Sequence, residues 1–300
     1  MAGIFLILLA CFAWAIDTLI RYPLVESGLS PITIVFYEHV ILSILFSWGV
    51  FAAFKRIGEL KLADVFSFFV VGCLGSGLAT VAFTQSFHYL NPSLVILLQK
   101  LQPVIAISLS ALVLKEPVDK KFVIWAAICL VGGFLVSSPD IERFYRLMVS
   151  DFSLVISDAA VHGYALVLVS IVGWGSATVF GKKLTIAGFE TKSILAGRFL
   201  AGLIALIPFM TWNRGLILTQ GEDYLRILIM VLISGALGMW FYYQGLKRIN
   251  AKTAAIAEMF FPFFAILVNW IFLGKQLSDV QLAGGALLVL GSLVIQLKKY

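Results

Sequence analysis

The sequence predicts an all-α membrane protein in which ten transmembrane helices form two inverted five-helix repeats around a central cavity. Composition gives the first reason: 61% of the 300 residues are hydrophobic and only 13% are charged, whereas soluble domains have roughly 45–50% apolar and about 25% charged residues. The second reason is a series of ten apolar segments, each close to the ~20 residues that cross a bilayer as a helix. The third is that the last five segments resemble the first five.

The predicted spans follow one another with short links that carry Gly, Pro, Asn or charged residues. They are residues 3–21, 31–54, 64–87, 92–114, 120–138, 161–181, 192–212, 224–246, 252–273 and 279–297. A longer link separates the fifth span from the sixth, and its apolar residues recur at helical spacing among charges. This pattern favours either an amphipathic helix in the membrane interface or a plain extracytoplasmic linker. The chain is therefore divided into repeats at 1–138 and 161–300, with the linker at 139–160.

The two repeats can be aligned in register. The stretch ACFAWAIDTLIR (10–21) aligns with SIVGWGSATVFG (170–181), so that Trp14 matches Trp174. In the same way residues 85–117 align with 244–276, and Pro103 matches Pro262. Because each repeat has an odd number of spans, the second enters the membrane in the opposite sense to the first. Inverted repeats of this kind are typical of secondary transporters, whose substrate site lies between the halves.

The orientation follows from the basic residues. The net charge is +6, and most Lys and Arg residues occur in one alternate set of links, which the positive-inside rule places in the cytoplasm. Both termini are therefore expected to be cytoplasmic, in the plasma membrane (the inner membrane of a bacterium). Since the basic residues occur in short links beside apolar runs, we expect contact with the lipid bilayer and not with nucleic acid.

The fourth span contains polar residues where a span should be apolar. Asn91 and Pro92 are favourable residues for a helix start, and Lys100 follows about 12 Å further along at ~1.5 Å per residue. Pro103 cannot donate a hydrogen bond to the carbonyl group of Gln99, so we expect a kink. Irregular backbone at this depth is tolerated only beside protein or a wet cavity. Gln99 and Gln102 share a helix face with the proline, and we expect this face to line a transport path.

Four charged residues within the predicted spans suggest two ion pairs. At similar depths, Glu38 could pair with Lys100, and Arg198 with Glu258. A charge within a span costs a few kcal/mol, so each needs a partner. The pairs could act as gates or bind a zwitterionic substrate; alternatively, they only fix the register of the helices.

Other polar and aromatic residues are candidates for the same cavity. Trp14, Trp174, Tyr242 and Tyr243 are expected to form aromatic walls. Asp17 either reaches the interface, pairs with Arg21, or lines the outer vestibule. Proton coupling through Glu258 is left open, and neither a cofactor nor a metal site is expected.

The chain resembles the drug/metabolite transporter superfamily, EamA type. The resemblance is carried by GWGSATVFGKK (173–183), by residues 242–295 and by residues 101–136. It implies ten helices, with spans 1–4 and 6–9 lining a central cavity and spans 5 and 10 at the periphery. The family usually has an acidic residue after the fourth and the ninth span. Glu116 fits this pattern, whereas Lys275 occupies the second position.

The function predicted is therefore secondary active transport by alternating access. The substrate is expected to be a small polar metabolite, amino-acid-like or another zwitterion, and export is favoured over import. A lipid or polyprenyl-carrier flippase is the alternative. A membrane-embedded enzyme is disfavoured, because the sequence contains neither an HExxH nor a GxSxG motif. Glycines in the fifth and tenth spans either pack these helices together or form a dimer face, so the protein is expected to be a monomer or a homodimer.

Overall fold

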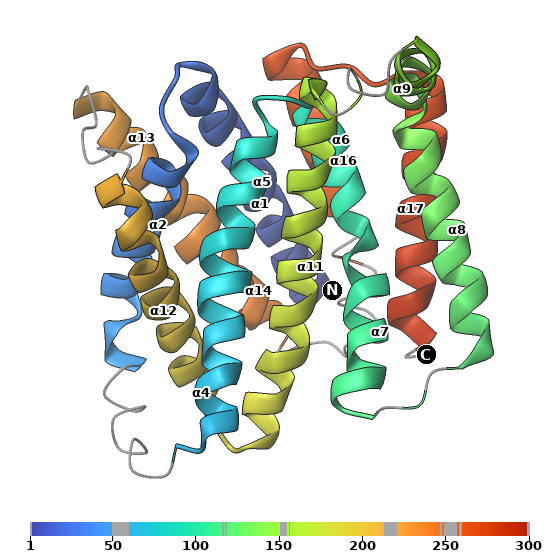
Figure 1. The fold of residues 1–300 in the computed structure, drawn as a ribbon. Helices are drawn as coiled ribbons and strands as arrows, with labels where there is room; N and C mark the ends of the chain where they lie inside the picture. Colours follow the sequence, from blue (N-terminus) through green and yellow to red (C-terminus); the bar gives the residue numbers. More distant parts are fainter. Residues whose placement is uncertain are drawn as a thin grey trace.

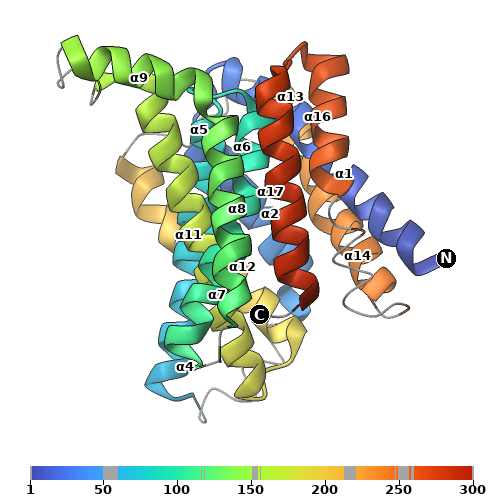
Figure 2. The same ribbon diagram turned by 90° about the vertical axis from the view of Figure 1, so that its right-hand side faces the viewer.

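The computed structural model describes residues 2–49, 60–115, 117, 119–150, 155, 157–212, 221–246, 248, 257 and 260–298. Within these ranges every regular element is helical, in agreement with the predicted all-α fold. Most helices run side by side along one direction, and α9 (Ser138–Ser150) extends sideways from the end of α8 (Lys120–Val136), as Figures 1 and 2 show. The angle between α8 and α9 is 71°.

The described residues contain six continuous helical stretches that are long and apolar enough to cross a membrane. Two are single helices in the first and second halves, α1 (Ala2–Glu26) and α11 (Ala159–Ile186). A third is α12 (Thr191–Trp212). The other three are composite: α4 (Leu62–Phe69), η2 (Val70–Leu78) and α5 (Ala79–Ser86); α6 (Pro92–Leu98), η3 (Gln99–Leu101) and α7 (Gln102–Val113); and α13 (Gly221–Met230), η4 (Val231–Leu237) and α14 (Gly238–Leu246). Their number and composition make this a multi-pass membrane protein.

A bent pair of helices and three shorter apolar helices accompany these stretches in the described structure. The bent pair of α8 and α9 meets the criteria for a seventh span when taken together. The others are shorter: α2 (Pro31–Leu45), α16 (Phe260–Leu273) and α17 (Asp279–Lys298). The ten-span count therefore stays a prediction, as does the position of α9 in the membrane interface.

Two of the composite stretches contain π-helical segments, in which the backbone hydrogen bonds reach back five residues. At the end of η2 the amide of Ala79 donates to the carbonyl oxygen of Leu74. At the end of η4 the amide of Gly238 donates to the carbonyl oxygen of Ile233. The segment η2 packs against α11 and α12, whereas η4 packs against α1 and α2. Each π-helical segment thus contacts helices from the opposite half of the chain.

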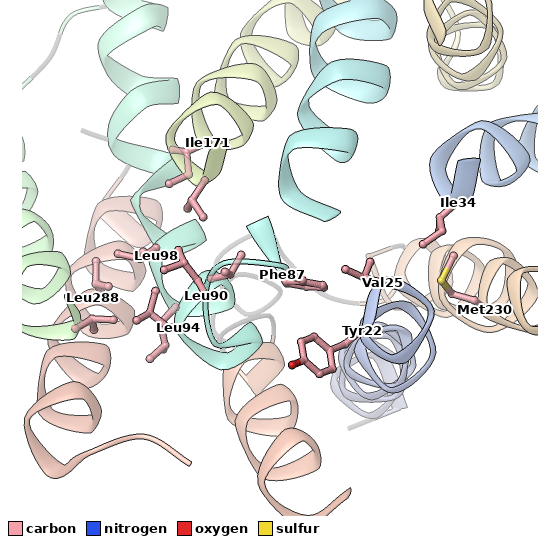
Figure 3. Packing of buried hydrophobic residues seen from close by; sticks show 14 of the residues in the cluster. Tyr22, Val25, Ile34, Phe87, Leu90, Leu94, Leu98, Ile171, Met230 and Leu288 are labelled. Carbon is pink, nitrogen blue, oxygen red and sulfur yellow. The ribbon is translucent and has the colours of Figure 1, made fainter. Parts of the chain in front are cut away.

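The main hydrophobic core joins helices from both halves. Figure 3 shows part of it, with side chains from distant parts of the sequence. Its labelled members are Tyr22, Val25, Ile34, Phe87, Leu90, Leu94, Leu98, Ile171, Met230 and Leu288. All of these side chains are at most 7% exposed. The core therefore packs α1, α2, α6, α11, α13 and α17 together.

Glycines bring α8 and α17 into close contact. A Cβ atom added at Gly284 would lie 2.7 Å from the backbone nitrogen of Val136 and 2.8 Å from the carbonyl oxygen of Gly132. Since these neighbours are backbone atoms, the helices would have to move apart. The glycines of the fifth and tenth predicted spans thus pack within the protein, which was the first of the two uses expected for them.

We expect Gly284→Ala to lower the free energy of unfolding by about 1–3 kcal/mol, the usual effect of overpacking. Gly181→Ala is the matched control, because a Cβ atom there has no neighbour within 4 Å. Thermal unfolding in detergent measures both variants. Equal stability of the two would contradict the close contact between α8 and α17.

Candidate functional site

A cavity of about 270 Å³ lies between the two halves of the chain. Its wall is formed by α1, α2, α5, η3, α11, α12, η4 and α16. The lining residues are Trp14, Asp17, Thr18, Arg21, Glu38, Leu42, Thr80, Phe83, Gln99, Trp174, Arg198, Phe199, Ser234, Gly235 and Phe261. The volume is close to the lower end of the ~300–1,000 Å³ found for sites that bind small molecules. Its wall combines aromatic rings with charged and hydroxyl groups, as such sites commonly do.

Charged side chains on one wall of the cavity form an ion-pair cluster around Arg21. The Arg21 side chain is 4% exposed. Its Nε donates to Asp17 Oδ2 at 2.6 Å, and its Nη2 donates to Glu38 Oε2 at 3.0 Å. Its Nη1 also donates to Thr84 Oγ1 at 3.1 Å. We call Asp17, Arg21, Glu38 and Thr84 the Arg21 cluster; it joins α1, α2 and α5.

The Arg21 cluster corrects the expected pairing of Glu38 with Lys100. The carboxylate of Glu38 pairs with Arg21 instead. The physical reason is the length of α1, which continues as a helix to Glu26. Arg21 therefore lies one turn beyond Asp17 inside the helix and not in a link. Of the three roles considered for Asp17, the structure shows the pairing with Arg21. Asp17 also lines the cavity, and its place in an outer vestibule stays a prediction.

The second cation of the cavity, Arg198, lies on α12. Its Nε is 3.3 Å from the hydroxyl oxygen of Ser76 in η2. Its guanidinium carbon lies 5.9 Å from the centre of the Phe199 ring. The expected partner Glu258 lies outside the described residues, so its pairing with Arg198 stays a prediction. The cavity wall nevertheless contains two acidic and two basic side chains, Asp17, Glu38, Arg21 and Arg198.

Aromatic side chains cover much of the remaining wall. Trp174 lies 5.1 Å from Phe83, measured between ring centres, and Trp14 lies 6.3 Å from Phe261. Tyr242 packs against Trp14 at 5.5 Å and is not among the residues that line the cavity. The side chain of Tyr243 is outside the described part of the structure. The two tryptophans matched in the repeat thus both reach the cavity, one from each half.

The break in the fourth predicted span lies beside the cavity. The helix changes to a single 3₁₀ turn at Gln99–Leu101, and α7 begins at Gln102 with Pro103 in its first turn. Gln99 lines the cavity, and its Oε1 is buried with no hydrogen-bond partner in the described structure. The ammonium group of Lys100 lies 5.2 Å from the centre of the Phe261 ring, which is itself part of the wall. The counterpart Pro262 is buried in the first turn of α16.

Lys275, in the link after α16, contacts the C-terminal end of α1. Its Nζ lies 3.5 Å from Glu26 Oε1 and 4.9 Å from the centre of the Tyr22 ring. The pKa of Lys275 is raised, because its ammonium group donates a hydrogen bond to the Tyr22 hydroxyl group and faces Glu26. The lysine that departs from the family's acidic pattern therefore connects the end of α1 to the link before α17. Glu116, the residue that fits the pattern, lies outside the described residues.

Sequence reasoning did not identify several lining residues. They are Thr18, Leu42, Thr80, Phe83, Phe199, Ser234, Gly235 and Phe261. Ser234 had a usable signal, since it is a polar residue in the middle of an apolar span. Phe83 and Phe261 had none, because phenylalanine is common in spans and only the packing shows which rings face the cavity.

Comparison with known proteins shows which family, relatives and solved structure this chain is similar to. The model of the EamA-like transporter family matches residues 1–138 and 161–297. The riboflavin transporter ImpX of Fusobacterium nucleatum is 32% identical over 306 residues, covering 98% of this chain and 97% of that protein. An uncharacterized transporter of Archaeoglobus fulgidus is 26% identical over 90% of both chains. A solved crystal structure shares the fold with a TM-score of 0.60 at 17% identity, and the match covers 99% of this chain and 98% of the other.

Proposed function

The chain belongs to the EamA-like transporter family, and we therefore propose that it carries a flat, polar heterocycle of the riboflavin type through the central cavity by alternating access. The family is one of transporters and not of enzymes, and in this proposal the cavity is the passage for the substrate. One observation carries this proposal: aromatic rings from both halves and a set of polar groups line the same cavity.

The polar groups of the wall match the edges of such a heterocycle. The Gln99 amide carries a buried oxygen with no hydrogen-bond partner among the described residues, and this oxygen can accept a hydrogen bond from an imide N–H of a substrate. Ser234 and Thr80 line the same space. An isoalloxazine ring offers two aromatic faces and a polar edge, and its ribityl chain adds hydroxyl groups. The name of the relative from Fusobacterium nucleatum points to the same substrate class.

The zwitterionic, amino-acid-like substrate expected from the sequence is the second candidate. It is favoured by the two acids and two bases in the wall. Three of these four groups, however, already form ion pairs with one another in the Arg21 cluster. A charged substrate would have to compete with these contacts for its partners. A neutral polar substrate does not, and we therefore place it first.

We further propose that the mechanism uses two inverted five-helix repeats, residues 1–138 and 161–300, with residues 139–160 as an extracytoplasmic linker. If each of the three shorter apolar helices also crosses the membrane, these helices make ten spans together with the six long stretches and the bent pair. The segments η2 and η4 begin as far apart in sequence as Trp14 and Trp174, within one residue. Each packs against the equivalent pair of helices in the other half. In this arrangement both termini are cytoplasmic and the protein lies in the plasma membrane.

Counterflow of labelled riboflavin into liposomes that contain the purified protein tests the substrate proposal. We expect labelled riboflavin to accumulate when unlabelled riboflavin is inside, and unlabelled amino acids inside to have no effect. Accumulation of labelled amino acids without riboflavin counterflow would favour the second candidate. Scrambling of labelled lipid in the same vesicles would indicate the flippase. Loading riboflavin on only one side of the liposome membrane would also compare the rates of transport in the two directions. It would show whether export, the direction expected from the sequence, is the faster one.

A further inference from the structure

We propose that Ser76 and Ser234, one in each π-helical segment, are positioning residues that orient the charged side chains of the opposite half within the cavity. Ser76 of η2 contacts Arg198 of α12, and Ser234 of η4 contacts Asp17 of α1. The inference rests on the proposed function and deepens it, since it names residues that set the affinity of the cavity for its substrate.

The π-helical backbone gives the two serines a shared structural setting. Such segments interrupt α-helices by one extra residue in a turn, and they occur frequently at functional sites. In the described structure η2 fits between α11 and α12, where a Cβ atom at Gly72 would lie 2.4 Å from Ala201 Cβ. Directly after η4, a Cβ atom at Gly238 would lie 2.8 Å from Trp14 Nε1. The glycines therefore allow each segment to approach the opposite half closely enough for its serine to reach across.

The contacts of Ser76 define a fixed chain of hydrogen bonds. His39 Nδ1 lies 2.8 Å from the carbonyl oxygen of Val35, and His39 Nε2 lies 2.9 Å from Ser76 Oγ. Because a carbonyl oxygen only accepts, Nδ1 carries the proton, and the Nε2 of the neutral ring accepts from the Ser76 hydroxyl group. Arg198 Nε, which only donates, then donates to Ser76 Oγ. The direction of every hydrogen bond from Val35 to Arg198 is thereby assigned.

The His39 ring, which belongs to this series of hydrogen bonds, is packed too tightly to rotate. His39 and Ser76 are 1% and 2% exposed. A Cβ atom at Gly202 would lie 2.7 Å from the Cδ2 atom of the His39 ring, so the ring lies directly against the backbone of α12. A protonated His39 would place a second positive charge next to Arg198. The neutral ring therefore acts as an acceptor that holds the Ser76 hydroxyl group with its lone pairs toward Arg198.

Ser234 plays the corresponding part on the other side of the cavity. Its hydroxyl oxygen lies 2.8 Å from Asp17 Oδ1 and 2.8 Å from the carbonyl oxygen of Met230. Its own carbonyl oxygen accepts a hydrogen bond from Trp14 Nε1 at 3.1 Å. One residue of η4 thus contacts both the carboxylate that pairs with Arg21 and the tryptophan of the cavity wall. Ser76 of the first half thus contacts Arg198 of the second half, and Ser234 of the second half contacts Asp17 of the first half.

The test compares Ser76→Ala and Ser234→Ala with Ser67→Ala. Ser67 is a matched control in the same composite stretch as Ser76: it is buried, and its hydroxyl group donates to the carbonyl oxygen of Ala63 in its own helix at 2.7 Å. Hydrogen bonds to charged groups stabilise by amounts that correspond to roughly a tenfold change in an equilibrium constant. We expect the KM for riboflavin counterflow to rise about tenfold in both variants, with a smaller change in kcat. Ser67→Ala should keep the KM of the unchanged protein.

A second measurement does not depend on the substrate. Thermal unfolding in detergent is measured for Ser76→Ala, Arg198→Gln and the double variant, and likewise for Ser234→Ala with Asp17→Asn. We expect the double variants to lose less stability than the two single variants together, because each pair shares one interaction. Ser67→Ala combined with Arg198→Gln should be additive.

The two measurements separate this inference from the substrate proposal. Coupling between the paired residues in a protein that does not transport riboflavin would support the positioning role and reject the substrate. Additive stability together with an unchanged KM in Ser76→Ala and Ser234→Ala would overturn the inference, whatever substrate is transported.

Discussion

Replacing Arg21 with glutamine is expected to abolish transport and to lower the free energy of unfolding by about 3–5 kcal/mol, the usual effect of removing one partner from a buried ion pair. The guanidinium group is the shared cation of Asp17 and Glu38, at 2.6 and 3.0 Å. Without it, two carboxylates face each other at the cavity wall. Each carboxylate is mostly buried, with 15% and 17% of its side chain exposed, so water replaces the lost partner poorly. Thermal unfolding in detergent and riboflavin counterflow measure the two effects.

Arg226→Gln is the control for this prediction. Arg226 pairs with Glu222 at 2.5 Å on α13, but the two side chains are 44% and 61% exposed. Exposed pairs contribute about 0–1 kcal/mol, so the control should remain stable. The double variant Arg21→Gln, Glu38→Gln should regain part of the stability lost in Arg21→Gln, since it removes one unpaired carboxylate. If Arg21→Gln were as stable as Arg226→Gln, the Arg21 cluster would not hold the cavity wall together.

Replacing Trp174 with alanine is expected to raise the KM for riboflavin about tenfold to hundredfold, with a smaller change in kcat. Stacking of an aromatic side chain on a heterocyclic base contributes about 1–3 kcal/mol by alanine substitution, and about 1.4 kcal/mol corresponds to a tenfold change. Trp174 lines the cavity and packs against Phe83 at 5.1 Å. Trp174→Phe keeps an aromatic face and should retain much of the affinity. Counterflow measured over a range of riboflavin concentrations gives both constants.

Trp240→Ala provides the comparison, because Trp240 is 56% exposed and is not among the residues that line the cavity. Its KM should equal that of the unchanged protein. An amino-acid-like substrate would depend on Arg198 and the acidic residues more than on an aromatic wall. A normal riboflavin KM in Trp174→Ala would therefore argue against stacking in the cavity and return the zwitterion to first place.

The sequence was sufficient to select several residues of the cavity wall. Glu38, Gln99 and Arg198 could be chosen because polar groups in apolar spans need a cavity or a partner. Trp14 and Trp174 could be chosen because they match in the repeat. All five line the cavity. Whether they bind substrate stays a prediction. The family was also predicted correctly, since its diffuse motifs extend over both halves of the chain.

The arrangement of partners was not accessible from the sequence. Which cation reaches Glu38 depends on where α1 ends and how the helices are rotated, and composition fixes neither. The sequence places Arg21 at the end of a span, whereas in the structure it is 4% exposed within α1. The π-helical segments could not be predicted from the sequence either. Their glycine-rich stretches resemble those of ordinary spans, and only the backbone shows that Ser76 and Ser234 reach the opposite half.

The central claim is that the substrate passes through the cavity between the halves, and a cysteine at Thr80 tests it most directly. Thr80 lines the cavity, whereas Leu78 in the same composite stretch is 45% exposed and is not among the lining residues. Each position is changed to cysteine in a chain without its native Cys11, Cys73 and Cys129. A charged thiol reagent should modify Thr80→Cys and stop transport, riboflavin should slow that reaction, and Leu78→Cys should show neither effect. Full transport by modified Thr80→Cys, with no protection by riboflavin, would contradict the account.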